Sequence, residues 1–238
     1  MPTTPVPPQG NAVADPIAAI HNAPQNKSFV VAQLGQSLDG RIATLTGESR
    51  WINKQAALVH VHRIRAAVDA VVVGIGTVVA DDPMLNVRHV EGRNPARVVI
   101  DPNGRLPLDA RMLLDDGSRR LVVGRGRAGL PKGVEVINVP AGPEGLPPCA
   151  VVAALYQAGL RTMLVEGGAR TVSGFIDAGA IDRLHVLVAP VILGSGKPGL
   201  SLKPIERLSQ ALRPTAAIHV LADGDVIFEC DMRSAAKE

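Results

Sequence analysis

The sequence predicts an α/β protein built on one mixed sheet with helices on both faces. Two observations lead to this fold class. Short and fully apolar segments, such as residues 70–73 and 163–165, alternate with segments of helical spacing, which is typical of strands buried on both faces. The chain ends in two strand-like segments, residues 217–221 and 226–230, on either side of the turn pair Asp223-Gly224. This C-terminal antiparallel hairpin makes the expected sheet mixed and not purely parallel.

A single domain is expected to hold almost the whole chain, because 238 residues suit one large core better than two small ones. We expect this domain to cover residues 28–233. Residues 1–27 contain many Pro, Asn, Gln and Ala residues, and we expect them to form a mobile tail. Residues 234–238 are expected to form a short second tail.

Each expected element rests on a local pattern. The segment 54–67 places Ala57, Leu58, Val61 and Ile64 at helical spacing. The Asp-Pro-Asn-Gly turn at residues 101–104 ends the strand before it. In chain order the predicted strands are residues 28–32, 70–73, 97–100, 121–123, 134–139, 163–165, 184–189, 217–221 and 226–230, and the predicted helices are residues 54–67, 149–159 and 169–178.

Composition disfavours several classes of function. Aromatic residues make up 2% of the chain and no long run of Lys and Arg occurs, so we expect no nucleic-acid partner. The net charge of +3 suits a small anionic ligand. No apolar stretch reaches the ~20 residues that a membrane span needs, and the N-terminus lacks the basic-then-apolar pattern of a secretory signal. We therefore expect a cytoplasmic protein with no membrane contact.

Metal and disulfide chemistry are not expected either. Cys149 and Cys230 lie far apart in the sequence and offer neither zinc spacing nor a disulfide framework. His60 and His62 are two residues apart on a predicted helix, so they face different directions and make a poor metal pair. His185 is isolated in the sequence.

The most informative motif is Glu166-Gly167-Gly168, directly after the predicted strand 163–165 and directly before a predicted helix. Two glycines at such a turn let the backbone approach a ligand, and the helix that follows presents free N–H groups to a phosphate. Phosphate repels a carboxylate, so Glu166 is expected to meet a hydroxyl or an amine. The turn predicts a phosphorylated, sugar-containing ligand, although glycines in a turn can equally serve close packing.

Two polar clusters precede this motif. Residues 37–43 contain Asp39-Gly40, for which a plain turn is the simplest interpretation. Residues 46–51 contain Ser49 and Trp51. Asn53 is better placed to cap the next helix, so Ser49 is free for a ligand, and Trp51 can form a flat wall for a ring.

A third cluster begins with Gly74 and Gly76 after the strand 70–73. Val79 stands where a Rossmann fingerprint needs its third glycine, so a nucleotide-binding fold of another kind is favoured. Asp81 and Asp82 are adjacent and point in different directions, which excludes a catalytic carboxylate pair. One acid can turn the chain at the following proline while the other is left for a ligand, and a solvated acidic turn is the alternative.

Taken in order, these clusters resemble a known family. The resemblance is carried by SLDGRIA, TGESRWI, DAVVVGIGTVVADDPMLNVR, RVVID, LVEGGA and LHVLVAPVILG, over about residues 29–230. These segments are similar to the reductase domain of bacterial riboflavin biosynthesis, the RibD C-terminal domain, which is similar to dihydrofolate reductase in fold. The resemblance implies a single-domain dihydrofolate reductase-like fold. It also implies an NADPH-dependent enzyme that reduces the ribosyl group of an aminopyrimidine ribose 5-phosphate to ribityl, of the 5-amino-6-(5-phosphoribosylamino)uracil reductase type.

Individual roles follow from the same resemblance. Hydride would pass from nicotinamide C4 to C1′ of the opened sugar, held as an imine, and Asp81 and Glu166 are the candidates for handling the proton. NADPH would contact Gly35, Trp51, Thr77, Asp81, Gly167, Gly168, Ala169, Arg170, Thr171 and Gly174, with residues 168–174 around the diphosphate. The substrate would contact Ser49, Arg65, Leu85, Arg88 and Glu166.

The chain departs from the family pattern at Gln33 and Val191, where the riboflavin enzymes often have lysine. A lost cation near a phosphorylated substrate weakens the case for that substrate. An NADPH-dependent reductase of a pterin-like, folate-like or small carbonyl compound is therefore one alternative, and a non-catalytic nucleotide-binding sensor is another. The resemblance implies a homodimer. The bacterial enzymes of this family are commonly fused to a deaminase domain, and there is no room for one before Phe29. We therefore expect either a separate deaminase in the same pathway or a different substrate.

Overall fold

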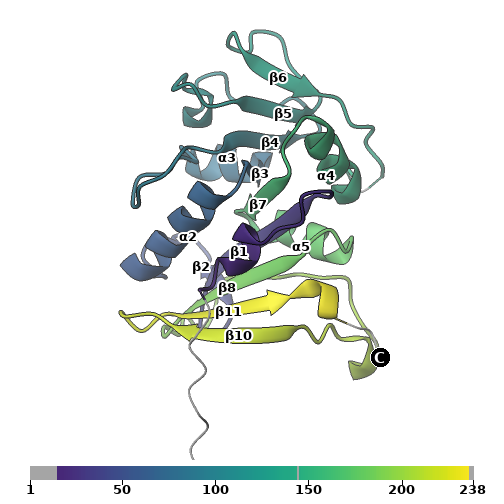
Figure 1. The fold of residues 1–238 in the computed structure, drawn as a ribbon. Coiled ribbons are helices and arrows are strands. Elements are labelled where there is room, and N and C mark those ends of the chain that lie inside the picture. Colours follow the sequence, from purple (N-terminus) through teal and green to yellow (C-terminus); the bar gives the residue numbers. More distant parts are fainter. Residues whose placement is uncertain (1–14, 144, 236–238) are drawn as a thin grey trace, which may run out of the picture.

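The computed structural model describes residues 15–143 and 145–235, which form one nine-stranded sheet with helices on both faces (Figure 1). Across the sheet the strands follow the order β10 (Thr215–Val220), β11 (Val226–Asp231), β8 (Arg183–Ala189), β1 (Phe29–Ser37), β7 (Thr162–Glu166), β3 (Ala70–Gly74), β4 (Ala96–Asp101), β5 (Arg120–Gly124) and β6 (Val134–Ile137). All pairs from β8 to β6 are parallel, whereas β10–β11 and β11–β8 are antiparallel. The predicted mixed α/β sheet with a C-terminal hairpin is confirmed.

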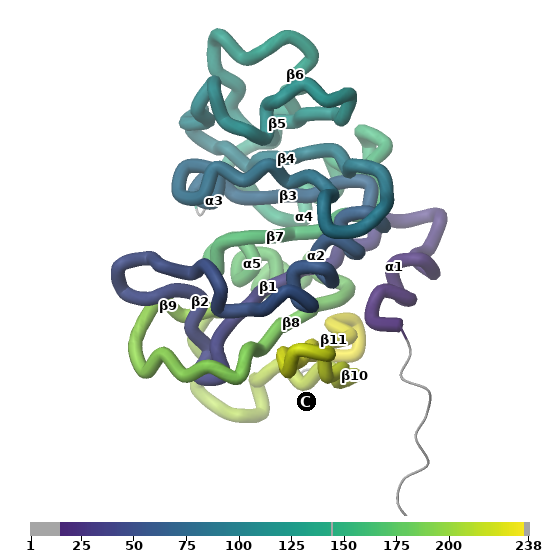
Figure 2. Tube along the Cα trace, turned by 90° about the vertical axis from the view of Figure 1, so that its left-hand side faces the viewer, coloured from purple at the N-terminus to yellow at the C-terminus, as the bar shows by residue number. Residues whose placement is uncertain are grey.

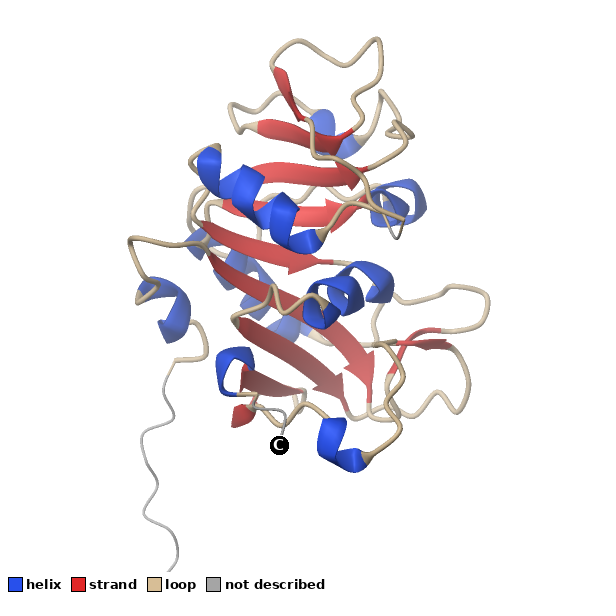
Figure 3. Ribbon diagram, turned by 90° about the vertical axis from the view of Figure 1, so that its right-hand side faces the viewer, coloured by secondary structure: helices blue, strands red, loops and turns tan. Residues whose placement is uncertain are grey.

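Two layers of helix cover the sheet because successive strand residues point to opposite faces. Val71 and Val73 face the layer of α2 (Gln55–Ala67) and α3 (Ile75–Asp81), and Val72 faces the layer of α4 (Pro148–Gln157) and α5 (Ala169–Asp177). Figure 3 shows these helices on either side of the strands. Both cores are mainly aliphatic, as the fully apolar strands predict.

A small second sheet was not predicted. β2 (Arg41–Ala43) pairs antiparallel with β9 (Lys197–Pro198), and the two project together beside the main sheet (Figure 2). These strands are too short for a period-two pattern to be recognised in the sequence. Three short 3₁₀ helices complete the described chain: Arg111–Leu113, Leu208–Gln210 and Met232–Ser234.

Part of the expected N-terminal tail, residues 1–27, is folded: residues 15–27 are described and pack against the domain. Residues 1–14 lie outside the described part of the chain, as do residues 236–238 of the expected C-terminal tail. The next residues form α1 (Ala18–His21), which buries Ile20 in the core beneath α2, and the flanking Ile17 and Ala23 are buried there as well. Three apolar residues within seven positions are enough to dock a short helix, although the surrounding composition is polar.

The start of α2 also differs from the prediction. Asn53 does not cap this helix; its amide donates to the Leu187 carbonyl at 3.3 Å. The C-terminal hairpin supplies the cap instead, because the Asp223 carboxylate accepts from the Ala56 N–H at 2.7 Å and Asp225 accepts from the Lys54 N–H at 2.8 Å. Two carboxylates remote in sequence therefore satisfy free donors at the start of the helix.

His185 is not isolated in space. His60 Nε2 and His185 Nδ1 share a hydrogen bond of 2.9 Å, which links α2 to β8 in the buried layer. Within the described part of the chain, no group of three or more His, Cys, Asp or Glu residues is arranged to hold a metal ion. Among the same residues, no helix combines the length and the apolar character needed to cross a membrane.

Candidate active site

The candidate site lies at the carboxyl edge of the parallel strands. β1, β7 and β3 are neighbours and run in the same direction, so their ends at Ser37, Glu166 and Gly74 meet at one edge of the sheet. Ligands of open α/β sheets bind outside these carboxyl ends. The helices and loops that follow these three strands carry most of the residues that the sequence singled out.

The two glycines of the turn after β7 differ in their surroundings. The fold requires a glycine at position 167, whereas position 168 has free space beside it. Gly167 has a φ of +90°, and a Cβ there would come 2.6 Å from Thr77 Oγ1. Gly168 has a φ of −41°, and a Cβ there would meet Thr77 Oγ1 at an ordinary 3.5 Å. Among the residues that the structure describes, and apart from its own chain neighbours, no other atom lies within 4 Å of that Cβ. Gly168 is therefore the position at which the open space is available to a ligand.

Thr77 fastens this turn to α3. Its hydroxyl oxygen accepts from the Gly168 N–H at 3.0 Å, while the hydroxyl proton remains available to donate. Thr77 itself lies in the first turn of α3, so the starts of α3 and α5 lie beside each other.

The first turn of α5 has the character of an anion site. It holds no acidic residue, and the exposed Arg170 stands where the helix dipole opposes a cation. A bound anion would relieve that opposition and accept from the free N–H groups. Ala169 begins the helix at this point.

The expected wrapping segment 168–174 is corrected, because α5 already begins at Ala169. Gly174 therefore lies in a later turn of the helix, where backbone N–H groups bond to carbonyls of the helix itself. The Thr171 hydroxyl packs directly against Gly74, which has room for it only because it lacks a Cβ. An anion can meet only the start of α5, not the whole segment.

Glu166 and Arg65 form a buried ion pair with each other. Arg65 Nε donates to Oε1 of Glu166 at 2.7 Å and Nη2 donates to Oε2 at 2.5 Å. The two residues are 6% and 9% exposed. Burial alone would lower the pKa of Arg65, but the Glu166 carboxylate outweighs it and holds that pKa above its ordinary value.

This pairing changes what was expected of both residues. We expected each residue to contact the substrate separately. In the structure they form a bidentate ion pair with each other. Because both Glu166 oxygens already accept from Arg65, Glu166 is poorly placed as a proton donor. Arg65 Nη1 donates to the Asn86 carbonyl at 3.1 Å, so the guanidinium also holds the chain that leads to Arg88.

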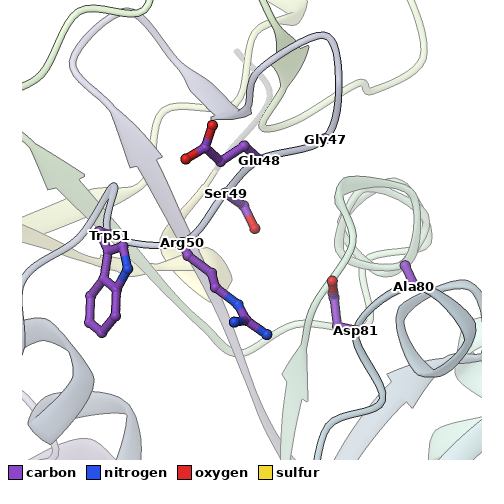
Figure 4. Close-up of a pocket in the computed structure, with 7 residues that line it drawn as sticks. All are labelled: Gly47, Glu48, Ser49, Arg50, Trp51, Ala80 and Asp81. Carbon is purple, nitrogen blue, oxygen red and sulfur yellow. The ribbon is translucent and has the colours of Figure 1, made fainter.

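A cavity of about 490 Å³ lies between the loop after β2 and the end of α3 (Figure 4). Its lining residues are Gly47, Glu48, Ser49, Arg50, Trp51, Ala80 and Asp81. The cavity thus brings together Ser49, Trp51 and Asp81, which the sequence predicted as ligand contacts. Arg50 was missed, although its basic side chain stands between Ser49 and Trp51 in the sequence.

The side chains that line this cavity do not all point into it. Figure 4 shows Arg50 extending toward Asp81, whereas the Trp51 ring points away from Asp81. Trp51 is 81% exposed and has a φ of +74°. Asp82 makes the turn after α3, with a φ of +38° and a carboxylate that accepts from the Arg111 N–H at 2.8 Å. Asp81 is left facing the cavity.

Arg88 lies in a region of surplus positive charge. Burial, followed by the charges of Arg65 and Arg111, lowers the pKa of Arg88 from its ordinary value. Its Nη1 donates to Asn86 Oδ1 at 3.1 Å, and the side chain is otherwise exposed. Cations that repel one another in this way are suited to an anionic ligand such as a phosphate.

Two expected ligand contacts have structural explanations. The Leu85 side chain is 1% exposed and belongs to the core, so only its main chain can reach a ligand. Gly35 leaves room for the Asn53 side chain, which a Cβ on Gly35 would overlap.

Asp39 does more than form the expected plain turn. Its carboxylate accepts from the Ser37 hydroxyl at 2.7 Å and from the N–H groups of Leu193 and Gly194 at 3.1 and 2.8 Å. The Ser37 bond, followed by the Leu193 bond, lowers the pKa of Asp39 to about 2. Asp39 therefore ties the turn after β1 to the loop after β8, and only the tertiary structure reveals this.

Gln33 and Val191, the two positions where the family often has lysine, differ in their surroundings. Gln33 is half-buried on β1, opposite His185 of β8. Val191 is 37% exposed just after β8, and its carbonyl accepts from the Leu38 N–H at 2.8 Å. Nothing in the structure explains why either position lacks a lysine.

Comparison with known proteins gives one family. The family model of the RibD C-terminal domain matches residues 28–220. The chain is 33% identical to the 2,5-diamino-6-ribosylamino-4(3H)-pyrimidinone 5′-phosphate reductase of Methanothermobacter thermautotrophicus, over 79% of this chain and 90% of that protein. It is 35% identical to the reductase of the same name from Archaeoglobus fulgidus, over 71% of this chain and 83% of that protein.

Longer relatives carry the name RibD. The chain is 33% identical to the riboflavin biosynthesis protein RibD of Aquifex aeolicus, over 72% of this chain and 49% of that protein. It therefore spans about half the length of such relatives. Among solved structures, RibD of Acinetobacter baumannii is 32% identical with a TM-score of 0.77, covering 87% of this chain and 58% of that one.

A more distant structure shows the fold alone. Dihydrofolate reductase of Enterococcus faecalis is 13% identical with a TM-score of 0.50, covering 85% of this chain and 96% of that one. The order of the motifs, the mixed sheet and the matches over most of the chain agree with one another. The chain belongs to the RibD C-terminal domain family.

Proposed function

We propose that this protein is an NADPH-dependent reductase that converts the ribosyl group of an aminopyrimidine ribose 5-phosphate to ribityl in riboflavin biosynthesis. One observation carries the proposal. The open glycine turn at the start of α5 lies at the same edge of the sheet as the arginines around Arg88 and the polar cavity. The glycine turn can hold a diphosphate, and the arginines can hold a sugar phosphate. Two relatives of similar length are named as reductases of such a compound.

The residues at the turn fit a dinucleotide. Gly168 leaves room for a diphosphate, and the Thr77 hydroxyl and the first turn of α5 can donate to it. Bound NADPH would supply the hydride for the reduction. The dihydrofolate reductase neighbour is described as complexed with NADP(H).

On the substrate side, Arg88 holds the 5-phosphate and the Glu166–Arg65 pair faces the sugar. Reduction of the imine at C1′ breaks the C=N π bond, forms a C–H bond from the hydride, and leaves the nitrogen to take a proton. Asp81 is the better candidate to deliver that proton, since it is exposed at the cavity and Glu166 is bonded to Arg65. Ser49 and Arg50 orient the ligand beside it.

Two substrates must be compared to test the function. The bacterial-type substrate is a uracil, and the relatives of similar length are named for a 2-amino-pyrimidinone, which differs at ring position 2. We expect NADPH oxidation with one of them, and a ribityl product by mass spectrometry. NADPH binding without turnover of either would favour the pterin, folate or carbonyl alternative. No nucleotide binding would contradict both reductase interpretations, and the nucleotide-binding sensor with them.

Replacing Arg88 with alanine is expected to raise the KM for the ribosyl substrate by about 10- to 150-fold, because a charge-assisted contact contributes about 1.5–3 kcal/mol. The NADPH KM should stay unchanged. Arg93→Ala is the matched control, since Arg93 is exposed on the same loop and pairs with Asp69 at 2.9 Å. An unchanged substrate KM would remove Arg88 from the phosphate site.

We also propose a homodimer that uses the edge of the sheet at β10. Ile218 and Val220 alternate on this edge strand and are 57% and 76% exposed, which is unusual for aliphatic residues on an unpaired edge. Val220→Glu is expected to shift the mass in light scattering from dimer to monomer, whereas Leu114→Glu, at an exposed aliphatic residue away from β10, should not. A wild-type monomer would contradict the proposal. A cytoplasmic location and a separate deaminase stay predictions.

A further inference from the structure

The segment that carries Arg88 is held by side chains at several successive residues. Arg65 Nη1 donates to the Asn86 carbonyl at 3.1 Å, and Asn94 Oδ1 accepts from the Val87 N–H at 2.8 Å. The segment begins at Leu85, whose φ of +54° is strained for a branched residue. Such a conformation persists only where the surroundings enforce it.

The remaining tether comes from His62. Its Nδ1 accepts from the Arg88 N–H at 3.1 Å, and its ring meets the His89 ring edge-on with centroids 4.6 Å apart. His62 is 2% exposed on α2, and it belongs to no cluster of metal-ligating side chains among the described residues. As an acceptor at Nδ1, the imidazole is neutral and carries its proton on Nε2. Burial, then the charges of Arg65 and Arg88, lower the pKa of His62 to about 3 and so keep this form.

We propose that His62 is a positioning residue for substrate binding: its Nδ1 fixes the Arg88 main chain so that the guanidinium is set in place for the substrate phosphate. This inference rests on the proposed function. α2 then serves the site twice, because Arg65 holds the Asn86 carbonyl and His62, three residues earlier, holds the Arg88 amide.

Positioning of this kind has a distinct consequence. An Arg side chain has several rotatable bonds, so a main chain that moves lets the guanidinium sample many places and reduces the fraction of molecules ready to bind. The loss should appear in the KM for the phosphorylated substrate. It should spare kcat and the KM for NADPH, because the glycine turn lies on different elements.

Two variants of nearly equal shape separate the hydrogen bond from packing. H62N keeps an acceptor oxygen at the δ position, and H62L fills the same space without one. We expect H62L to raise the substrate KM by about three- to tenfold over H62N, the value of one hydrogen bond, with kcat within about twofold. Amide exchange measured by NMR should be faster at Arg88 in H62L than in H62N, with the amides of α5 unchanged.

Equal substrate KM values for two folded variants, or equal exchange at Arg88, would overturn the inference. A general loss of stability would raise exchange throughout the chain and lower kcat as well, which also counts against it. If the wild-type protein turns over neither aminopyrimidine, the proposed function fails separately. Exchange at Arg88 and the Kd for inorganic phosphate then decide the role of His62, with weaker phosphate binding by H62L expected.

Discussion

Arg65→Met is expected to lower the free energy of unfolding by about 3–5 kcal/mol, the usual cost of breaking a buried ion pair from one side. Methionine fills much of the space of the arginine stem, so the loss comes from the charge left behind. Glu166 would remain 6% exposed with neither of its two guanidinium bonds. Urea unfolding followed by circular dichroism measures the change.

The double variant Arg65→Met/Glu166→Leu is expected to recover most of this stability, because it removes both charges. Both the single and the double variant should be inactive, because Arg65 belongs to the proposed substrate site. Arg63→Met is the matched control: Arg63 lies on the same helix and pairs with Asp15 at 2.7 Å, but its side chain is 38% exposed, so we expect a change below about 1 kcal/mol. A double variant no more stable than Arg65→Met would show that the pair is not the source of the effect.

Gly168→Val is expected to weaken NADPH binding by about 10- to 100-fold, since overpacking a close contact typically costs about 1–3 kcal/mol. The fold should tolerate the change. Among the described residues a Cβ at this position meets Thr77 Oγ1 alone, at 3.5 Å, and the φ of −41° lies outside the left-handed region that favours glycine. Fluorescence titration with NADPH gives the affinity, and thermal unfolding checks the fold.

Two other glycines control for this experiment. Gly167→Ala should destabilise the protein, because its φ is +90° and the new Cβ would approach Thr77 Oγ1. Gly174→Ala should leave the affinity unchanged and raise stability by about 0.5–1 kcal/mol, because this glycine lies inside α5 with open space around it. Retained affinity in a folded Gly168→Val protein would mean that the turn serves packing alone.

The order of elements could be predicted because its signals are local. Fully apolar runs predicted β3 and β7, helical spacing predicted α2 and α5, and the Asp223-Gly224 turn predicted the final hairpin. α1 was missed because its apolar residues are few and lie within a polar stretch. β2 and β9 were missed because strands of three and two residues carry no pattern.

The candidate residues could be named, but their pairing could not. The sequence singled out Glu166, Arg65 and Arg88 by chemistry and by family resemblance. It could not show that Glu166 bonds to Arg65, 101 residues away, or that His62 accepts from Arg88. The hydrogen bonds of Asp39 to the loop after β8 were equally hidden.

By itself, the sequence determined the fold class, the glycine turn before α5 and the family, because each depends on neighbouring residues or on motifs in order. Only the tertiary structure decided which charges meet, which glycine is open to a ligand and which side chains hold Arg88. These features depend on how the strands align and how each helix is rotated on the sheet. Packing of the whole core sets both, and no local segment specifies them.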